Sequence, residues 1–162
     1  MRPGAACILT LDPRLAQKID RALFPGLQGG PHVNKFAAIA TAFKIAKTEK
    51  FRLLQQQTVK NASALAQALC SRGMRVPCGG TDTHMLLLDC KTVMGEDGTP
   101  LMGDTAATIL DIVGIVVNKN SIPEDKTAAY PSGIRLGTPW VTQRGLLEDD
   151  TEKNCRYHSH CP

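Results

Sequence analysis

Two consecutive amphipathic helices, with no strand between them, divide this chain into two parts. The first helix is predicted to begin near Asn34, a plausible N-cap, and its apolar face is formed by Phe36, Ile39, Ala40 and Phe43. The second is predicted from about residue 48 to residue 71, and Gly73 is well suited to end it. Helices in series are typical of a connection from one domain to the next.

We therefore predict a domain boundary near Met74. Residues 1–73 form the end of one domain together with the connecting helices, and residues 74–150 form a smaller second domain. Residues 151–162 are an atypical tail, because they have no apolar periodicity that would complete a helix.

The first part combines a strand, a helix and a loop. Cys7–Leu11 is a short apolar run that Asp12-Pro13 interrupts, which predicts a buried strand. Apolar residues four apart predict an amphipathic helix over Pro13–Leu23. The segment Phe24–His32 contains two prolines and three glycines, so we expect an irregular loop there.

The second part has the pattern of an α+β unit. A helix is predicted over Asp104–Val113, opened by an acidic cap, and a last helix over Gln143–Asp150, capped by Thr142. Three short apolar runs predict the strands Met85–Leu88, Ile115–Val117 and Ile134–Leu136.

Composition excludes several classes of protein. A chain that is 43% hydrophobic and 21% charged is globular rather than disordered or fibrous. Basic residues are dispersed and aromatic residues make up only 4%, so we expect no nucleic-acid partner. No apolar run approaches the roughly 20 residues of a membrane span, and the first ten residues contain no hydrophobic stretch of the length that a secretory signal requires. We expect a cytoplasmic protein with reduced cysteines and no membrane contact.

A glycine pair precedes the first of the two consecutive helices. Gly29 and Gly30 leave backbone N–H groups accessible just before Asn34, which is an arrangement that binds anions such as phosphate. The more ordinary explanation of a Gly-Gly pair is a turn that needs positive φ. The sequence by itself leaves both open.

An arginine lies in the last predicted strand. Arg135 is flanked by apolar residues and glycines, and its planar guanidinium matches a carboxylate with two parallel hydrogen bonds. It therefore binds either a small carboxylic acid or an internal Asp or Glu. The amides of Asn118 and Asn120 are suited to hydrogen bonding a polar heterocycle, or else to satisfying their own turn.

Two further groups of residues are weaker candidates for a functional site. Asp82 and His84 stand just before a predicted strand. They form either an acid/base pair or, as is more usual for such residues, a cap on the start of the strand. Four possible zinc ligands crowd the tail, a spacing too tight for a standard structural site, so we predict no metal. They are Cys155, His158, His160 and Cys161.

Four motifs in series closely resemble those of serine hydroxymethyltransferase. The resemblance covers roughly residues 2 to 150 and corresponds to the later part of that enzyme. The motifs are Phe24–His32, Gly79–His84, Asn118–Pro123 and Pro131–Pro139.

The resemblance implies a fold and a reaction. The family has the α/β fold of the fold-type-I pyridoxal-phosphate transferases, so the chain would hold the end of the large cofactor domain, the connecting helices and the α+β C-terminal domain. The family interconverts serine and tetrahydrofolate with glycine and 5,10-methylenetetrahydrofolate, as a homodimer or tetramer.

The resemblance also assigns roles to residues. Arg135 would bind the carboxylate of serine or glycine, and the backbone of Gly29 and Gly30 would reach the phosphate of the pyridoxal 5'-phosphate held by the partner subunit of the family's dimer. Asn120 would contact folate. A loop that approaches folate would contain Thr127, Ala128 and Ala129.

One element of the family pattern is missing. The Schiff-base lysine stands in a Thr-His-Lys-Thr context in the family, and no lysine here has that context; Lys18 lies on an ordinary amphipathic helix. We therefore expect no catalytic lysine and no activity from this chain alone. Two hypotheses remain, namely a piece of an enzyme that needs its missing half, or a non-catalytic remnant that serves in folding or dimerisation.

Overall fold

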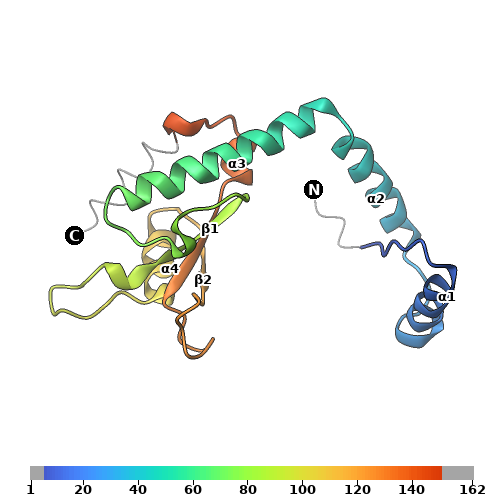
Figure 1. Cartoon of the computed structure of the whole chain (residues 1–162), viewed down its shortest axis with the longest axis horizontal. Coiled ribbons are helices and arrows are strands. Elements are labelled where there is room, and N and C mark those ends of the chain that lie inside the picture. Colours follow the sequence, from blue (N-terminus) through green and yellow to red (C-terminus); the bar gives the residue numbers. More distant parts are fainter. Residues whose placement is uncertain (1–5, 151–162) are drawn as a thin grey trace. The chain divides into compact units, whose positions relative to one another are not determined.

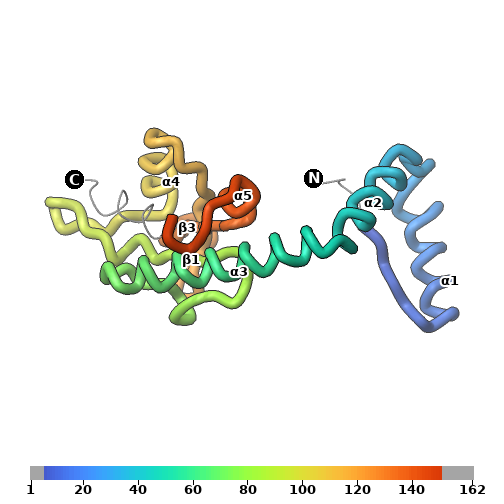
Figure 2. Tube along the Cα trace, turned by 90° about the horizontal axis from the view of Figure 1, so that it is seen from above, coloured from blue at the N-terminus to red at the C-terminus, as the bar shows by residue number. Residues whose placement is uncertain are grey.

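The computed structural model describes residues 6–150, which form two compact units divided between Arg52 and Leu53 (Figure 1). The first unit contains α1 (Pro13–Arg21), η1 (Ala22–Leu27) and α2 (Val33–Ala46). The division falls early in α3 (Glu49–Cys70). The second unit contains the rest of α3, a three-stranded sheet, α4 (Gly103–Ile112) and α5 (Pro139–Gln143), and its course is followed in Figure 2. This mixture of helix and sheet is the predicted fold class.

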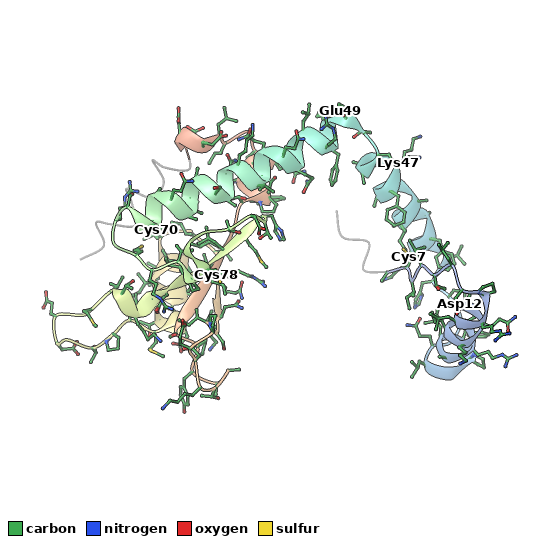
Figure 3. All side chains as sticks on the ribbon, viewed as in Figure 1. Cys7, Asp12, Lys47, Glu49, Cys70 and Cys78 are labelled. Carbon is green, nitrogen blue, oxygen red and sulfur yellow. The ribbon has the colours of Figure 1, made fainter. Side chains whose placement is uncertain are left out.

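The first unit contains no buried residue between positions 6 and 52. Asp12, labelled in Figure 3, caps α1 because its Oδ1 accepts hydrogen bonds from Arg14 N at 2.8 Å and Leu15 N at 3.3 Å. The predicted strand Cys7–Leu11 is wrong: residues 6–10 have no regular structure, and Leu11 is fully exposed. The apolar run finds no partner strand among residues 6–150, and a strand is stable only in a sheet.

The Pro- and Gly-rich segment is only partly irregular. A π-helical turn, η1, follows α1 and is kinked at Phe24, where φ is −135°. The loop predicted over Phe24–His32 is therefore confirmed only from residue 28 to residue 32. Helix α2 begins at Val33, so His32 rather than Asn34 occupies the N-cap position, and it makes no side-chain capping bond.

The sheet has the strand order β1-β3-β2, with both pairs antiparallel. Its strands are β1 (Met85–Asp89), β2 (Asn118–Asn120) and β3 (Gly133–Gly137), so two of the three predicted strands are confirmed. The predicted strand Ile115–Val117 is wrong, because the backbone pairs with β3 only from Asn118 onward. Val117 packs against the core from a loop instead.

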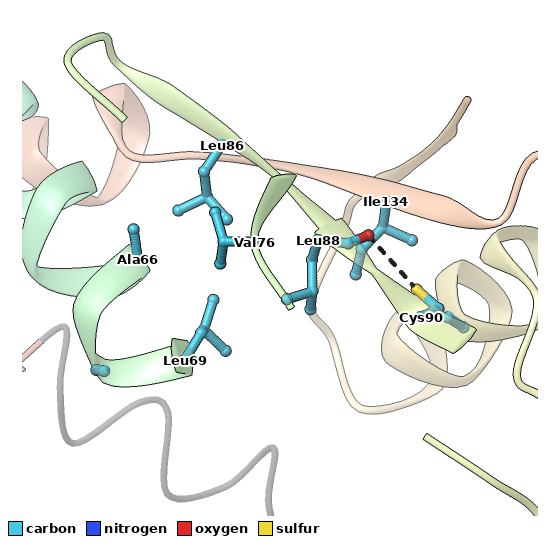
Figure 4. Packing of buried hydrophobic residues seen from close by; sticks show 9 residues of the cluster. Ala66, Leu69, Val76, Leu86, Leu88, Cys90 and Ile134 are labelled. Atoms are coloured by element: carbon cyan, nitrogen blue, oxygen red, sulfur yellow. Dashed lines mark hydrogen bonds between the residues drawn. The ribbon is translucent and has the colours of Figure 1, made fainter. Parts of the chain in front are cut away.

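One face of the sheet carries the core of the second unit (Figure 4). Leu86 and Leu88 are two residues apart in β1, and Ile134 of β3 is paired with Leu88, so the three side chains lie on the same face. Leu69 of α3 and Ala106 of α4 pack in the same cluster. The cluster is the hydrophobic core of the described residues. On the opposite face of β3, Gly133 is buried, whereas Arg135 and Gly137 are exposed.

Helix α3 is joined to α5 by buried polar groups. Asn61 Nδ2 donates to Thr142 Oγ1 at 2.9 Å and to the carbonyl of Leu146 at 2.8 Å. Thr138 Oγ1 donates to the carbonyl of Thr58 at 2.7 Å. These bonds fix the chain immediately after β3 onto α3.

The last predicted helix and the start of α4 need correction. Thr142, the predicted cap of a helix over Gln143–Asp150, lies inside α5 instead. The predicted helix itself is interrupted at Gly145, where φ is +95°. Residues 148–150 are helical again. Helix α4 begins at Gly103, with Met102 at the N-cap position, and it has no side-chain cap. Asp104, the predicted acidic cap, lies inside the helix, and its carboxylate accepts a hydrogen bond from the next residue, Thr105 N, at 3.0 Å.

Candidate functional site: the open face of the sheet

Arg135 stands on the sheet face that points away from the core. Its neighbours in β3, Ile134 and Leu136, pack on the core side, while Gly133 and Gly137 share the side of Arg135. The guanidinium therefore has no side chain beside it along its own strand. Although apolar residues flank it in the sequence, Arg135 is exposed.

No acidic residue among positions 6–150 forms an ion pair with Arg135. The alternative of an internal Asp or Glu partner is therefore not supported within the described chain. An apolar cavity opens on the other side of the sheet, between α4 and the core strands, and Arg135 does not border it. A carboxylate that binds Arg135 would have to approach from the open face.

Asn118 and Asn120 lie on this same face. In the antiparallel pair of β2 and β3, Asn118 is opposite Arg135 and Asn120 is opposite Gly133. Asn118 Nδ2 donates to Asn120 Oδ1 at 2.5 Å and to the carbonyl of Lys119 at 3.2 Å. Both asparagines are strand residues rather than turn residues, so the structure brings them together with Arg135 on one surface.

The loop of residues 121–132 follows β2 directly. Thr127, Ala128 and Ala129 are exposed in it, and Ala129 N donates to Thr127 Oγ1 at 3.2 Å. Asp125, which the sequence analysis missed, organises this loop through hydrogen bonds to Ile122 and Ser132. The signal was present, because an Asp in a proline-containing loop often accepts bonds from nearby backbone amides.

Charged groups surround the base of this loop. The Ser132 hydroxyl, together with backbone amides, holds the pKa of Asp125 below its usual range. Arg75 pairs with Asp89 at 2.7 Å and also with Glu124, which lowers the pKa of Glu124. These bonds connect the loop to the end of β1.

The glycine pair belongs to the first unit. Neither Gly29 nor Gly30 has a positive φ, so the turn that would require glycine is not the reason for the pair. A Cβ on either residue would meet nothing within 4 Å. No hydrogen bond found within residues 6–150 uses their amides as donors. The N–H groups are therefore open to an anion, ahead of a helix whose N-cap side chain makes no capping bond.

The weaker candidates receive little support. Asp82 and His84 share no hydrogen bond; the strand entry is capped instead by Thr81 Oγ1, which donates to the Met85 carbonyl at 2.6 Å. The four possible zinc ligands of the tail, for which the sequence predicted no metal, lie outside the described residues, and within positions 6–150 no group of His, Cys, Asp or Glu could hold a metal ion. The described cysteines are all free. None of the helices found between positions 6 and 150 could cross a membrane.

Comparison with known proteins identifies the class of protein. The family model described as serine hydroxymethyltransferase matches residues 10–158. Proteins named serine hydroxymethyltransferase from Bombyx mori and Rickettsia canadensis (strain McKiel) are 48% and 47% identical to the chain over 139 and 149 residues. These alignments cover 86% and 91% of the chain, but only 29% and 34% of the relatives.

A third relative gives the same result. The protein named serine hydroxymethyltransferase, cytosolic, from Oryctolagus cuniculus is 45% identical over 139 residues, which are 86% of the chain and 28% of that relative. The chain belongs to the serine hydroxymethyltransferase family and spans about a third of the length of these curated relatives.

Proposed function

We propose that this chain contributes the amino-acid and folate side of a pyridoxal-phosphate-dependent serine hydroxymethyltransferase, which converts serine and tetrahydrofolate to glycine and 5,10-methylenetetrahydrofolate. Family membership supports the reaction. The observation that carries the residue assignment is the exposed, unpaired Arg135 on the same sheet face as Asn118 and Asn120. We further propose that the enzyme acts as a homodimer or tetramer in the cytoplasm and has no nucleic-acid or membrane partner.

Arg135 would bind and orient the substrate. Its guanidinium offers two parallel N–H donors to the carboxylate of serine or glycine, and Gly137, which is exposed, places no side chain beside it on that face of the strand. A fixed carboxylate determines which bonds at the α-carbon face the reacting groups, so this contact supplies orientation.

Asn120 would contact the folate. Its side chain is half-buried at the end of β2, and its Oδ1 already accepts a bond from Asn118, which leaves the Nδ2 donors for a heterocycle acceptor. The exposed residues Thr127, Ala128 and Ala129 would line the approach from the following loop.

The glycine pair fits a phosphate. The N–H groups of Gly29 and Gly30 are unused by hydrogen bonds of the described chain, and the residues lack side chains that would keep phosphate oxygens away. We assign them to the phosphate of the pyridoxal 5'-phosphate held by the partner subunit of a dimer, a cofactor that when bound supplies the electron sink for bond cleavage at the α-carbon. No lysine of this chain has the family's Schiff-base context, so we expect no serine cleavage from it alone.

The carboxylate assignment is tested by titrating the 162-residue chain with glycine. Arg135→Ala should weaken glycine binding by about tenfold to a hundredfold, because a charge-assisted bidentate bond is lost, and Arg135→Lys should restore it only in part. Arg144→Ala is the matched control, since Arg144 stacks on Trp140 in the same unit, 5.2 Å from the ring centroid. Equal glycine affinities for the Arg135→Ala and Arg144→Ala variants would refute the assignment.

A further inference from the structure

One carboxylate ties together the two ends of the β2–β3 loop. Ile122 N and Ser132 N both donate to Asp125 Oδ2, at 3.1 and 2.9 Å, and Ser132 Oγ donates to Asp125 Oδ1 at 2.5 Å. We call Ile122, Asp125 and Ser132 the neck of the loop. Antiparallel strands need a connection of only two residues, so a loop from 121 to 132 requires such a closure to keep a defined shape.

The neck is packed as well as bonded. Ile122 is 4% exposed and Ser132 is 1% exposed, and the side chain of Asp125 is 7% exposed. A Cβ on Gly133 would lie 2.5 Å from Ile122 Cγ2, so the two ends of the loop approach as closely as glycine permits. The first amide of α4, Gly103 N, donates to the carbonyl of Pro131 at 3.0 Å.

The tip of the loop has no comparable support. Residues 126–130 are all exposed, and Tyr130 is 75% exposed. Within the described part of the chain, their hydrogen bonding consists of the bond from Ala129 N to Thr127 Oγ1. The position of the tip therefore depends on the neck, where the Asp125 carboxylate accepts three hydrogen bonds.

We propose that Asp125 is a positioning residue for folate: it closes the neck and thereby holds the tip, residues 126–130, in a fixed place relative to β2. Lys91 Nζ, 3.8 Å from Asp125 Oδ1, and the pairing of Arg75 with Glu124 attach the same segment to the end of β1. The folate part of this inference rests on the proposed function, whereas the closure of the neck does not.

The experiment measures the order of the tip and the affinity for tetrahydrofolate separately, on the whole 162-residue chain. Asp125→Asn keeps the shape of the side chain but presents an NH₂ group where one oxygen accepted. By ¹⁵N relaxation, we expect the order parameters of Thr127–Ala129 to fall below about 0.6, while those of β1 stay near about 0.85. Affinity for tetrahydrofolate should fall by about tenfold, because binding must then order the tip, and affinity for glycine should not change.

Two further variants keep the test decisive. Asp97→Asn is the matched control, because Asp97 Oδ1 also accepts bonds from a backbone amide and a hydroxyl, both of Thr99, but in another loop. It should leave the tip and the tetrahydrofolate affinity unchanged. Ser132→Ala removes only the hydroxyl donor and should loosen the tip in the same direction, which covers the case in which Asp125→Asn unfolds the unit.

The outcomes separate the inference from the proposed function. A tip that stays ordered in both the Asp125→Asn and the Ser132→Ala variants overturns the inference. So does a loosened tip with undiminished tetrahydrofolate affinity. If the unsubstituted chain binds no tetrahydrofolate, the folate assignment of the proposed function fails, while the order parameters still decide whether Asp125 closes the neck.

Discussion

At the scale of the residue, Cys90 differs from the other described cysteines. Burial, aided by the neighbouring Asp89 carboxylate, raises the pKa of its thiol to about 11, whereas Cys70 and Cys78 are exposed. The thiolate is the reactive form, so at pH 8 a thiol reagent should modify Cys70 and Cys78 and spare Cys90 until the unit unfolds. Peptide mass spectrometry measures the labelling rate of each cysteine. If Cys90 were labelled as fast as Cys78, the prediction would be wrong.

The same thiol predicts a pH dependence of stability. In the unfolded chain the Cys90 thiol ionises near its ordinary pKa of 9.0, below its folded pKa of about 11. Between these values the unfolded state binds fewer protons, so the free energy of unfolding should fall as pH rises from about 9 to about 11. Urea unfolding at several pH values measures this slope, and Cys90→Ala should reduce it.

Single residues also show what the sequence could and could not predict. Arg135 stands out because a charged side chain is unusual in an apolar strand pattern, whereas Asn120 was indicated by its amide and by the family resemblance. The register of β2 and β3 brings both to one face. An Asp in this loop indicates a bond to a nearby amide such as Ile122 N, but it does not indicate the second bond, from Ser132 N, so the closure of the loop was missed. Helical and strand periodicity carries no information about such a closure.

At the scale of the element, β3 contains two glycines with opposite surroundings. A Cβ on Gly133 would lie 2.5 Å from Ile122 Cγ2 and 2.9 Å from the carbonyl oxygen of Leu88, whereas one on Gly137 would be 3.7 Å from the nearest atom. Gly133→Ala should therefore destabilise the second unit by about 1–3 kcal/mol, and Gly137→Ala by less than about 0.5 kcal/mol. Urea unfolding followed by circular dichroism compares them; equal transition midpoints would rule out the steric explanation.

Helices and strands were predictable to different degrees. Periodicity alone located α3 within two residues at each end, since a long amphipathic pattern is set by local sequence. Strand formation depends on a partner, which explains both errors. Cys7–Leu11 has none among the described residues, and Ile115–Val117 precedes the segment that actually pairs with β3.

At the scale of the whole molecule, the two units differ in how much they bury. The core cluster extends from Ala66 to Ile134 within the second unit, and residues 6–52 bury no side chain. Large apolar side chains such as Phe36 and Phe43 are 57% and 54% exposed. Since burial of apolar surface is the main favourable term in folding, we expect the second unit to be the more stable of the two.

Limited trypsin digestion of the whole chain tests this difference and the position of the boundary. Cleavage should begin in the first unit and leave a resistant fragment that starts after Lys50 or Arg52, because α3 carries buried residues from Thr58 onward. Cleavage after Lys60, which lies among the buried positions of the same helix, should be slower by a large factor and serves as the internal control. A fragment that starts after Arg72 would instead place the boundary near Met74, as the sequence predicts. A resistant N-terminal fragment would show that the first unit is stabilised by contacts other than a buried core.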